Sequence, residues 1–240
     1  MLRSLDELEE GFEGISKKSK EDCGDKLEEI RQLTYVSRHI EKTIRGLVES
    51  DSSKYRNSLV FGCFLRLVRI SGHILFLSCN ALYRNAFDDI RHALESVVQA
   101  LYIDLRHPKT DINTRIEILK EVEGKREYRV MRLIEELKIE HKEKLKEEYK
   151  RLSRIVHPSH KQIEAVWRDI LEGKGIPATI DCEEISKIYD SMKKMYDIFF
   201  FLFILRFPEF KKSLEKNLDF IKIIKVYNLT LLSTVFEVRL

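Results

Sequence analysis

Residues that break helices are scarce in this sequence. Only 4 prolines and 9 glycines occur among 240 residues, of which 43% are hydrophobic and 35% are charged. This composition, rich in Lys, Glu, Leu and Ile, favours long helices over a β-sandwich or a barrel. The sequence therefore predicts an all-α protein.

No linker of distinct composition divides the chain, and 240 residues are enough to bury one substantial core. We therefore expect one antiparallel helical-bundle domain with peripheral helices over 25–208. A flexible or loosely packed N-terminal arm is expected over 1–24, and a C-terminal appendage over 209–240.

Net charge is low, and nucleotide-binding motifs are missing. The 43 basic and 40 acidic side chains leave a net charge of +3, which is too small to indicate a nucleic-acid partner without a local basic patch. The sequence contains neither G-x-x-x-x-G-K-[ST] nor G-x-G-x-x-G. The common nucleotide-dependent enzyme classes are therefore not supported.

The four cysteines are scattered and form no C-x-x-C pair. Two of them lie inside an apolar helix, which favours reduced core thiols over a disulfide framework or a zinc site. We therefore expect reduced cysteines and a cytoplasmic protein. The cysteines are Cys23, Cys63, Cys79 and Cys182.

An uninterrupted hydrophobic run of membrane-spanning length is also missing. The first ten residues contain acids where a signal peptide needs an apolar stretch. The apolar run from Leu59 to Leu82 is interrupted by Arg66, Arg69 and His73. We interpret this run as a buried helix and expect no membrane association.

Apolar residues recur at three- and four-residue spacing along most of the chain, as is typical of amphipathic helices. The segment after Pro208 is ambiguous, because 226–238 also suits a strand. The expected helices cover about 25–49, 53–79, 82–106, two segments on either side of Gly124, 142–156, 163–171 and 182–206.

The segment from Tyr149 to His160 is the best place to look for chemistry. Leu152 and Val156 belong to a buried helical face, so Arg151 and Arg154 are expected to project from its other side. Pro158 ends the helix and favours an extended His157 beside the last carbonyls.

An arginine fork that holds a phosphate, next to a histidine that exchanges protons, is sufficient for metal-independent cleavage of RNA. The alternative reading is a helix end where cations compensate the dipole. No carboxylate or thiol accompanies His157 and His160 at ligand spacing, so no metal site is expected.

The pattern Arg151-x5-His157 resembles the Arg-x(4 to 6)-His motif of the HEPN superfamily, small helical bundles that include toxin and defence ribonucleases and many non-catalytic members. The pattern Tyr149-x-x-Leu-Ser-x-x-Val-His157-Pro-Ser, preceded by Arg91-His-Ala-Leu-Glu95, is similar to a group of uncharacterised prokaryotic helical proteins. The resemblance spans roughly residues 53–207.

In HEPN ribonucleases the arginine and the histidine of two subunits usually meet across a dimer interface. The resemblance therefore implies a homodimer that acts on RNA without a cofactor, with Arg151 as phosphate clamp and His157 as acid or base. Those nucleases often have a polar residue after the arginine, where this chain has Leu152. A non-catalytic interaction module with an antitoxin-like or other protein partner thus stays open.

Further binding candidates surround this motif in the predicted fold. Arg154 and His160 share its segment, and the stripe that contains Arg91 and Glu95 is either a ladder of intrahelical ion pairs or a polar wall facing the His157 turn. Arg66 and Arg69 form, with His73, a solvent-facing strip, a set of internal salt bridges or an anion pocket on an otherwise apolar helix. We expect these groups to meet in one polar cleft.

Overall fold

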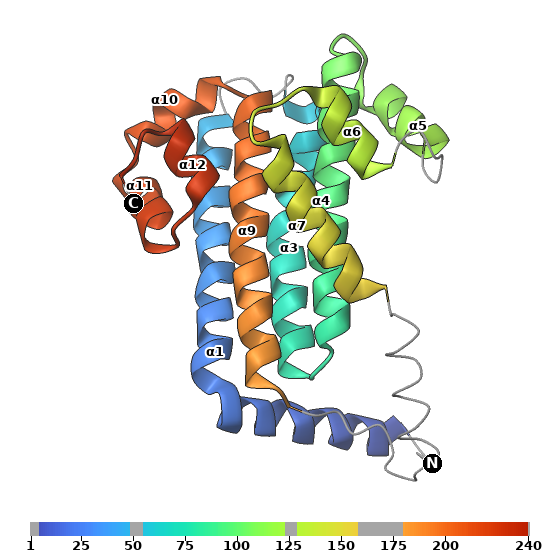
Figure 1. Cartoon of the computed structure of the whole chain (residues 1–240), viewed down its shortest axis with the longest axis vertical. Coiled ribbons are helices and arrows are strands. Elements are labelled where there is room, and N and C mark those ends of the chain that lie inside the picture. Colours follow the sequence, from blue (N-terminus) through green and yellow to red (C-terminus); the bar gives the residue numbers. More distant parts are fainter. Residues whose placement is uncertain (1–4, 49–54, 123–128, 158–179, 240) are drawn as a thin grey trace.

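The structure is a computed structural model that describes residues 5–48, 55–122, 129–157 and 180–239. Every regular element in these ranges is an α-helix, which confirms the predicted class (Figure 1). The helices are α1 (Leu5–Val48), α3 (Leu59–Cys79), α4 (Tyr83–Arg106), α5 (Ile112–Val122), α6 (Val130–Leu137), α7 (Lys142–Val156), α9 (Cys182–Arg206), α10 (Glu209–Glu215), α11 (Leu218–Val226) and α12 (Thr230–Val235).

Four long helices, α1, α3, α4 and α9, lie side by side and form the bundle, and α7 packs across α4 (Figure 1). Successive neighbours α1, α3 and α4 alternate in direction, as expected for an antiparallel bundle. Helix α9 runs parallel to α4. At their starts the Asp181 N–H donates to Tyr83 Oη at 2.8 Å, and near their ends Arg206 Nε donates to Asp104 Oδ2 at 3.3 Å.

The core of the bundle is built around α9. Its residues at alternating three- and four-residue steps are all 0–1% exposed, which confirms the predicted inward face. Its phenylalanines pack against α3, where the Phe64 and Phe203 rings lie 4.9 Å apart. Burying each such side chain contributes roughly 1.5–3 kcal/mol. The inward residues are Ile185, Ile188, Met192, Met195 and Phe199.

Helix α1 begins far earlier than the predicted start near Asp25. Residues 5–22 are helical rather than irregular, and they run across one end of the bundle (Figure 1). The helix axis changes direction at Cys23, whose backbone is non-helical with φ −129° and ψ 27°. The segment expected to be a flexible or loosely packed arm is therefore the first part of a kinked helix.

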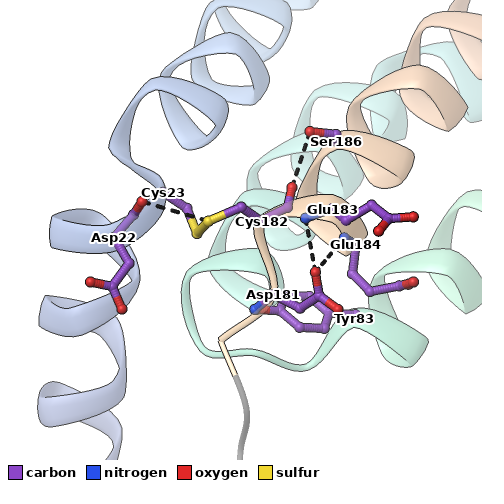
Figure 2. Close-up of a disulfide and its surroundings, with 8 residues drawn as sticks. All are labelled: Asp22, Cys23, Tyr83, Asp181, Cys182, Glu183, Glu184 and Ser186. Carbon is purple, nitrogen blue, oxygen red and sulfur yellow. Dashed lines mark hydrogen bonds between the residues drawn. A yellow bond between two sulfur atoms is a disulfide. The ribbon is translucent and has the colours of Figure 1, made fainter.

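A disulfide joins this kink to the start of α9 (Figure 2). Cys23 and Cys182 are separated by 159 residues, and their Cα atoms lie 5.4 Å apart. The prediction of reduced thiols is therefore wrong for this pair, because no local spacing pattern indicates a bond between such distant residues. It is correct for Cys63 and Cys79, which are free.

The C-terminal appendage is helical, which settles the ambiguity between helix and strand. Asp197 of α9 accepts hydrogen bonds from the Leu231 and Leu232 N–H groups at 2.8 and 2.9 Å and from Thr230 Oγ1 at 3.2 Å. These bonds satisfy the free N–H groups at the start of α12. A buried carboxylate far away in sequence thus fixes the conformation of the tail.

Within the described residues, α3 is the single helix long and apolar enough to cross a membrane by length and composition. It packs against α1, α4 and α9, and 39% of the residues in its most apolar 18-residue segment are buried. Its N-cap is Ser58, whose hydroxyl accepts from the Phe61 N–H. The helix predicted over 163–171 lies outside the described residues.

Candidate functional site

The bounds and the buried face of α7 agree with the sequence prediction. Leu145, Leu152 and Val156 are 0–7% exposed and pack into the bundle. His157 is the C-cap residue, with an extended backbone at φ −87° and ψ 110°. Its N–H still donates to the Ser153 carbonyl at 3.0 Å, so the helix ends directly at this histidine.

The His157 side chain is exposed at the end of α7. Next to it, Arg84 of α4 donates from Nε to the Val156 carbonyl at 2.8 Å, which satisfies one of the free carbonyls of the last turn. Arg84 therefore brings a second cation to the histidine. His160 lies outside the described residues.

An exposed stripe of basic residues continues from His157 along the solvent side of α7. It consists of Lys150, Arg154 and His157, which share one helical face at steps of four and three residues. All three side chains are exposed. In the described ranges, neither Lys150 nor Arg154 forms an ion pair. We call these residues the α7 stripe.

Arg151 does not belong to this stripe, because its side chain is bound to neighbours on the other flank. Its Nε donates to Glu148 at 3.0 Å and its Nη2 to Glu148 and to Ser191 Oγ, each at 2.5 Å. The Glu148 side chain is only 6% exposed, and Lys194 also reaches it at 3.2 Å. Arg151 therefore compensates a buried carboxylate and ties α7 to α9.

A cavity of about 300 Å³ lies beside this pair, between α7, α9 and the start of α12. Lys144, Arg151 and Lys194 line it together with three acids, Glu147, Glu148 and Asp197. The charges of its lining thus balance. The cavity offers no excess of positive charge for a phosphate.

The ladder on α4 lies against α7, on the flank opposite Arg151. Arg91 bonds to Asp88 at 3.0 Å and to Glu95 at 3.3 Å, so the predicted intrahelical ion pairs are present. Tyr149 of α7 lies at this ladder, where burial raises its pKa and the nearby Glu95 carboxylate adds to the rise. The ladder is therefore present, and it lies beside Tyr149 of α7, whereas its reading as a polar wall facing the His157 turn stays a prediction.

Arg66 and Arg69 are exposed on α3, and they do not meet the α7 motif. Arg66 lines a different cavity, to which α7 contributes no residue. His73 bonds instead to Asp89 of α4, with 2.5 Å between Nδ1 and Oδ2. The α3 residues Arg66, Arg69 and His73 therefore do not share the expected cleft with the His157 turn.

No protein-family model, curated protein or solved structure matches this chain. The resemblance to HEPN proteins thus rests on its motif residues, and it stays a prediction. Among the described residues, no group of three or more His, Cys, Asp or Glu side chains could hold a metal ion.

Sequence reasoning missed one buried polar cluster. Asp104 is fully buried and bonds to Arg115 Nη1 at 2.8 Å and to Arg206 Nε at 3.3 Å. It also accepts from Ser58 Oγ and from the Leu59 N–H at the start of α3. The available signal was Asp104 directly after the apolar residues 100–103, but its partners come from three other segments.

Proposed function

We propose that this protein binds RNA through phosphate contacts at the carboxyl-terminal end of α7. The supporting observation is the α7 stripe, with Lys150, Arg154 and His157 exposed on one face and Arg84 beside them. Lysine and arginine side chains neutralise phosphates, and such contacts provide most of the affinity of sequence-independent binding. These residues then contact the RNA backbone, and Arg151 is a structural residue.

The stripe is suited to this role because, among the described residues, Lys150 and Arg154 form no ion pair. Glu148 occupies Arg151, and Asp88 and Glu95 occupy Arg91. An arginine in such a pair must lose its carboxylate partner before it binds a phosphate. Exposed cations with no partner in the described residues pay no such cost.

Cleavage of RNA requires more than this stripe. At about 100° per residue, the Arg151 and His157 side chains leave α7 roughly 120° apart, so they do not converge within one chain. In the ribonuclease form of this proposal, a homodimer brings a cation of the second subunit to His157. The ribose 2′-hydroxyl then attacks the adjacent phosphate, and the bond from phosphorus to the 5′-oxygen of the next nucleotide breaks to leave a 2′,3′-cyclic phosphate. The proton of the hydroxyl passes through His157 to the leaving 5′-oxygen.

The binding experiment compares two variants that lose the same charge. Lys150→Gln/Arg154→Gln removes two cations from the stripe, and Lys222→Gln/Lys225→Gln removes two exposed lysines of α11. Fluorescence anisotropy with a labelled single-stranded RNA measures the affinity. The stripe variant should lose affinity by about tenfold or more, and the control variant should lose much less. Equal losses, or no binding by the wild type, would refute the proposal.

A second experiment separates binding from cleavage. Purified wild type and His157→Ala are incubated with the same RNA in chelator, and the oligomeric state is measured by light scattering. Cleavage by wild-type dimers that His157→Ala abolishes supports the ribonuclease form. RNA binding without cleavage by either protein supports a binding protein that lacks this activity.

A further inference from the structure

A second cavity, of about 650 Å³, lies between the first half of α3, the second half of α4 and α5. Pockets of roughly 300–1,000 Å³ are the size that holds small molecules in proteins. Its walls are mostly apolar, and it shares no residue with the α7 stripe. The apolar wall includes Leu59, Phe61, Leu65, Ala100, Ile112 and Leu119.

Helix α5 lies over this cavity with an apolar face that is incompletely covered. Ile112, Ile116 and Leu119 line the cavity at steps of four and three residues, so they share one face of α5. Ile116 is 36% exposed. The start of α5 is fixed by Arg115, which reaches Asp104 at 2.8 Å and the Asn57 carbonyl at 2.5 Å. A firmly anchored helix thus holds apolar side chains over space that the described residues leave open.

Two arginines belong to the lining of the cavity. Arg56 and Arg66 both line it, and both are exposed. Neither forms an ion pair within the part of the chain that the structure describes. The exposed part of the lining is therefore positively charged, whereas most of the other lining residues are apolar.

We infer that this cavity binds a single-chain amphiphile with an anionic headgroup, of the fatty-acid class. The acyl chain lies against Leu59, Leu65 and the α5 face, and the carboxylate bonds to the exposed arginines of the lining, Arg56 and Arg66. An apolar wall with exposed cations in its lining matches the two parts of such a ligand. This cavity is separate from the proposed RNA surface, so failure of RNA binding would not contradict ligand binding here.

Gly62 offers a position at which to fill the cavity. It lines the cavity from α3, and a Cβ added there would meet no atom within 4 Å. Gly62→Leu therefore adds a side chain at the lining whose Cβ has room, and it replaces the poorest helix former after proline. Gly72→Leu is the matched control, since Gly72 is in the same helix, also has no atom within 4 Å of its Cβ, and does not line the cavity.

The measurement is isothermal titration calorimetry of the full chain with dodecanoate and with dodecanol. The wild type should bind dodecanoate at a single saturable site, and each methylene removed from the probe should weaken binding roughly fourfold. Gly62→Leu should weaken binding at least about tenfold, while Gly72→Leu stays within about twofold. Arg56→Gln/Arg66→Gln should lower the affinity for dodecanoate about tenfold and change the affinity for dodecanol by less than about twofold.

Three results would overturn the inference. These are no binding by the wild type, equal affinity of wild type and Gly62→Leu, or equal losses in the two glycine variants. Equal weakening of dodecanoate and dodecanol by the arginine variant would overturn the assignment of the headgroup. Thermal unfolding checks that each variant is folded. If Gly62→Leu does not fold, the variant Arg56→Gln/Arg66→Gln still tests the site, because both arginines are exposed.

Discussion

Replacing Asp104 by alanine should destabilise this protein more than almost any other single substitution. Its carboxylate is fully buried and holds together the start of α3, the end of α4, α5 and the end of α9. The variant would leave Arg115, whose side chain is 2% exposed, without its charged partner. Arg206 is 15% exposed and can reach water, so the main cost arises at Arg115.

The expected loss follows from these contacts. Removing one partner of a buried ion pair costs about 3–5 kcal/mol, because the other charge stays buried and unpaired. Loss of the bonds to the first N–H groups of α3 adds about 1 kcal/mol. Total stabilities of domains are about 5–15 kcal/mol, so Asp104→Ala should lose a large fraction of the free energy of unfolding.

Urea unfolding followed by circular dichroism measures this loss. The companion variant Asp104→Ala/Arg115→Met removes the stranded charge and should recover at least about 2 kcal/mol. Asp219→Ala, at a side chain that is 75% exposed, should change stability by less than about 0.5 kcal/mol. A loss below about 1 kcal/mol in Asp104→Ala, or no recovery in the companion, would refute the reasoning.

Three further predictions follow from other contacts. A reductant should lower the free energy of unfolding by up to about 5 kcal/mol, because the Cys23–Cys182 bond closes a loop of 159 residues, and a thermal melt that reductant leaves unchanged would contradict this. Burial raises the pKa of Cys63 to about 12, so peptide mapping should show alkylation about a thousandfold slower than in the unfolded chain, and comparable rates would contradict this. Arg151→Ala should destabilise by about 1–3 kcal/mol and Arg154→Ala by less than about 0.5 kcal/mol in urea unfolding; the reverse order would show that Arg151 is not structural.

Local signals in the sequence were enough to place most of the helices. Helices α4, α7 and α9 end where a proline follows, at Pro108, Pro158 and Pro208, and their buried faces follow the apolar periodicity. The extended backbone of His157 has the same origin. These features depend on residues within a few positions, which is why sequence alone predicts them.

Contacts between distant segments were beyond this reasoning. Nothing near Cys23 indicates Cys182, and nothing near Asp104 indicates both Arg115 and Arg206 as partners. The conformation of the C-terminal tail depends on a buried Asp197, which lies more than thirty residues before the N–H groups it binds.

The surroundings of Arg151 contain one contact that sequence reasoning can predict and two that it cannot. Glu148 precedes Arg151 by three residues, so this ion pair could have been predicted from helical spacing. The bonds that α9 adds, from Arg151 to Ser191 and from Lys194 to Glu148, could not. They make Arg151 a structural residue, and the exposed cations of α7 replace it as the candidate phosphate contacts.

The salt dependence of RNA affinity tests the proposed role of α7 most directly. Each phosphate contact to a single strand contributes about 0.7 to the slope of log affinity against log salt concentration. Lys150→Gln/Arg154→Gln should therefore lower this slope by about 1.4, while Lys222→Gln/Lys225→Gln leaves it unchanged. Identical slopes for the wild type and the stripe variant would show that these residues do not contact RNA.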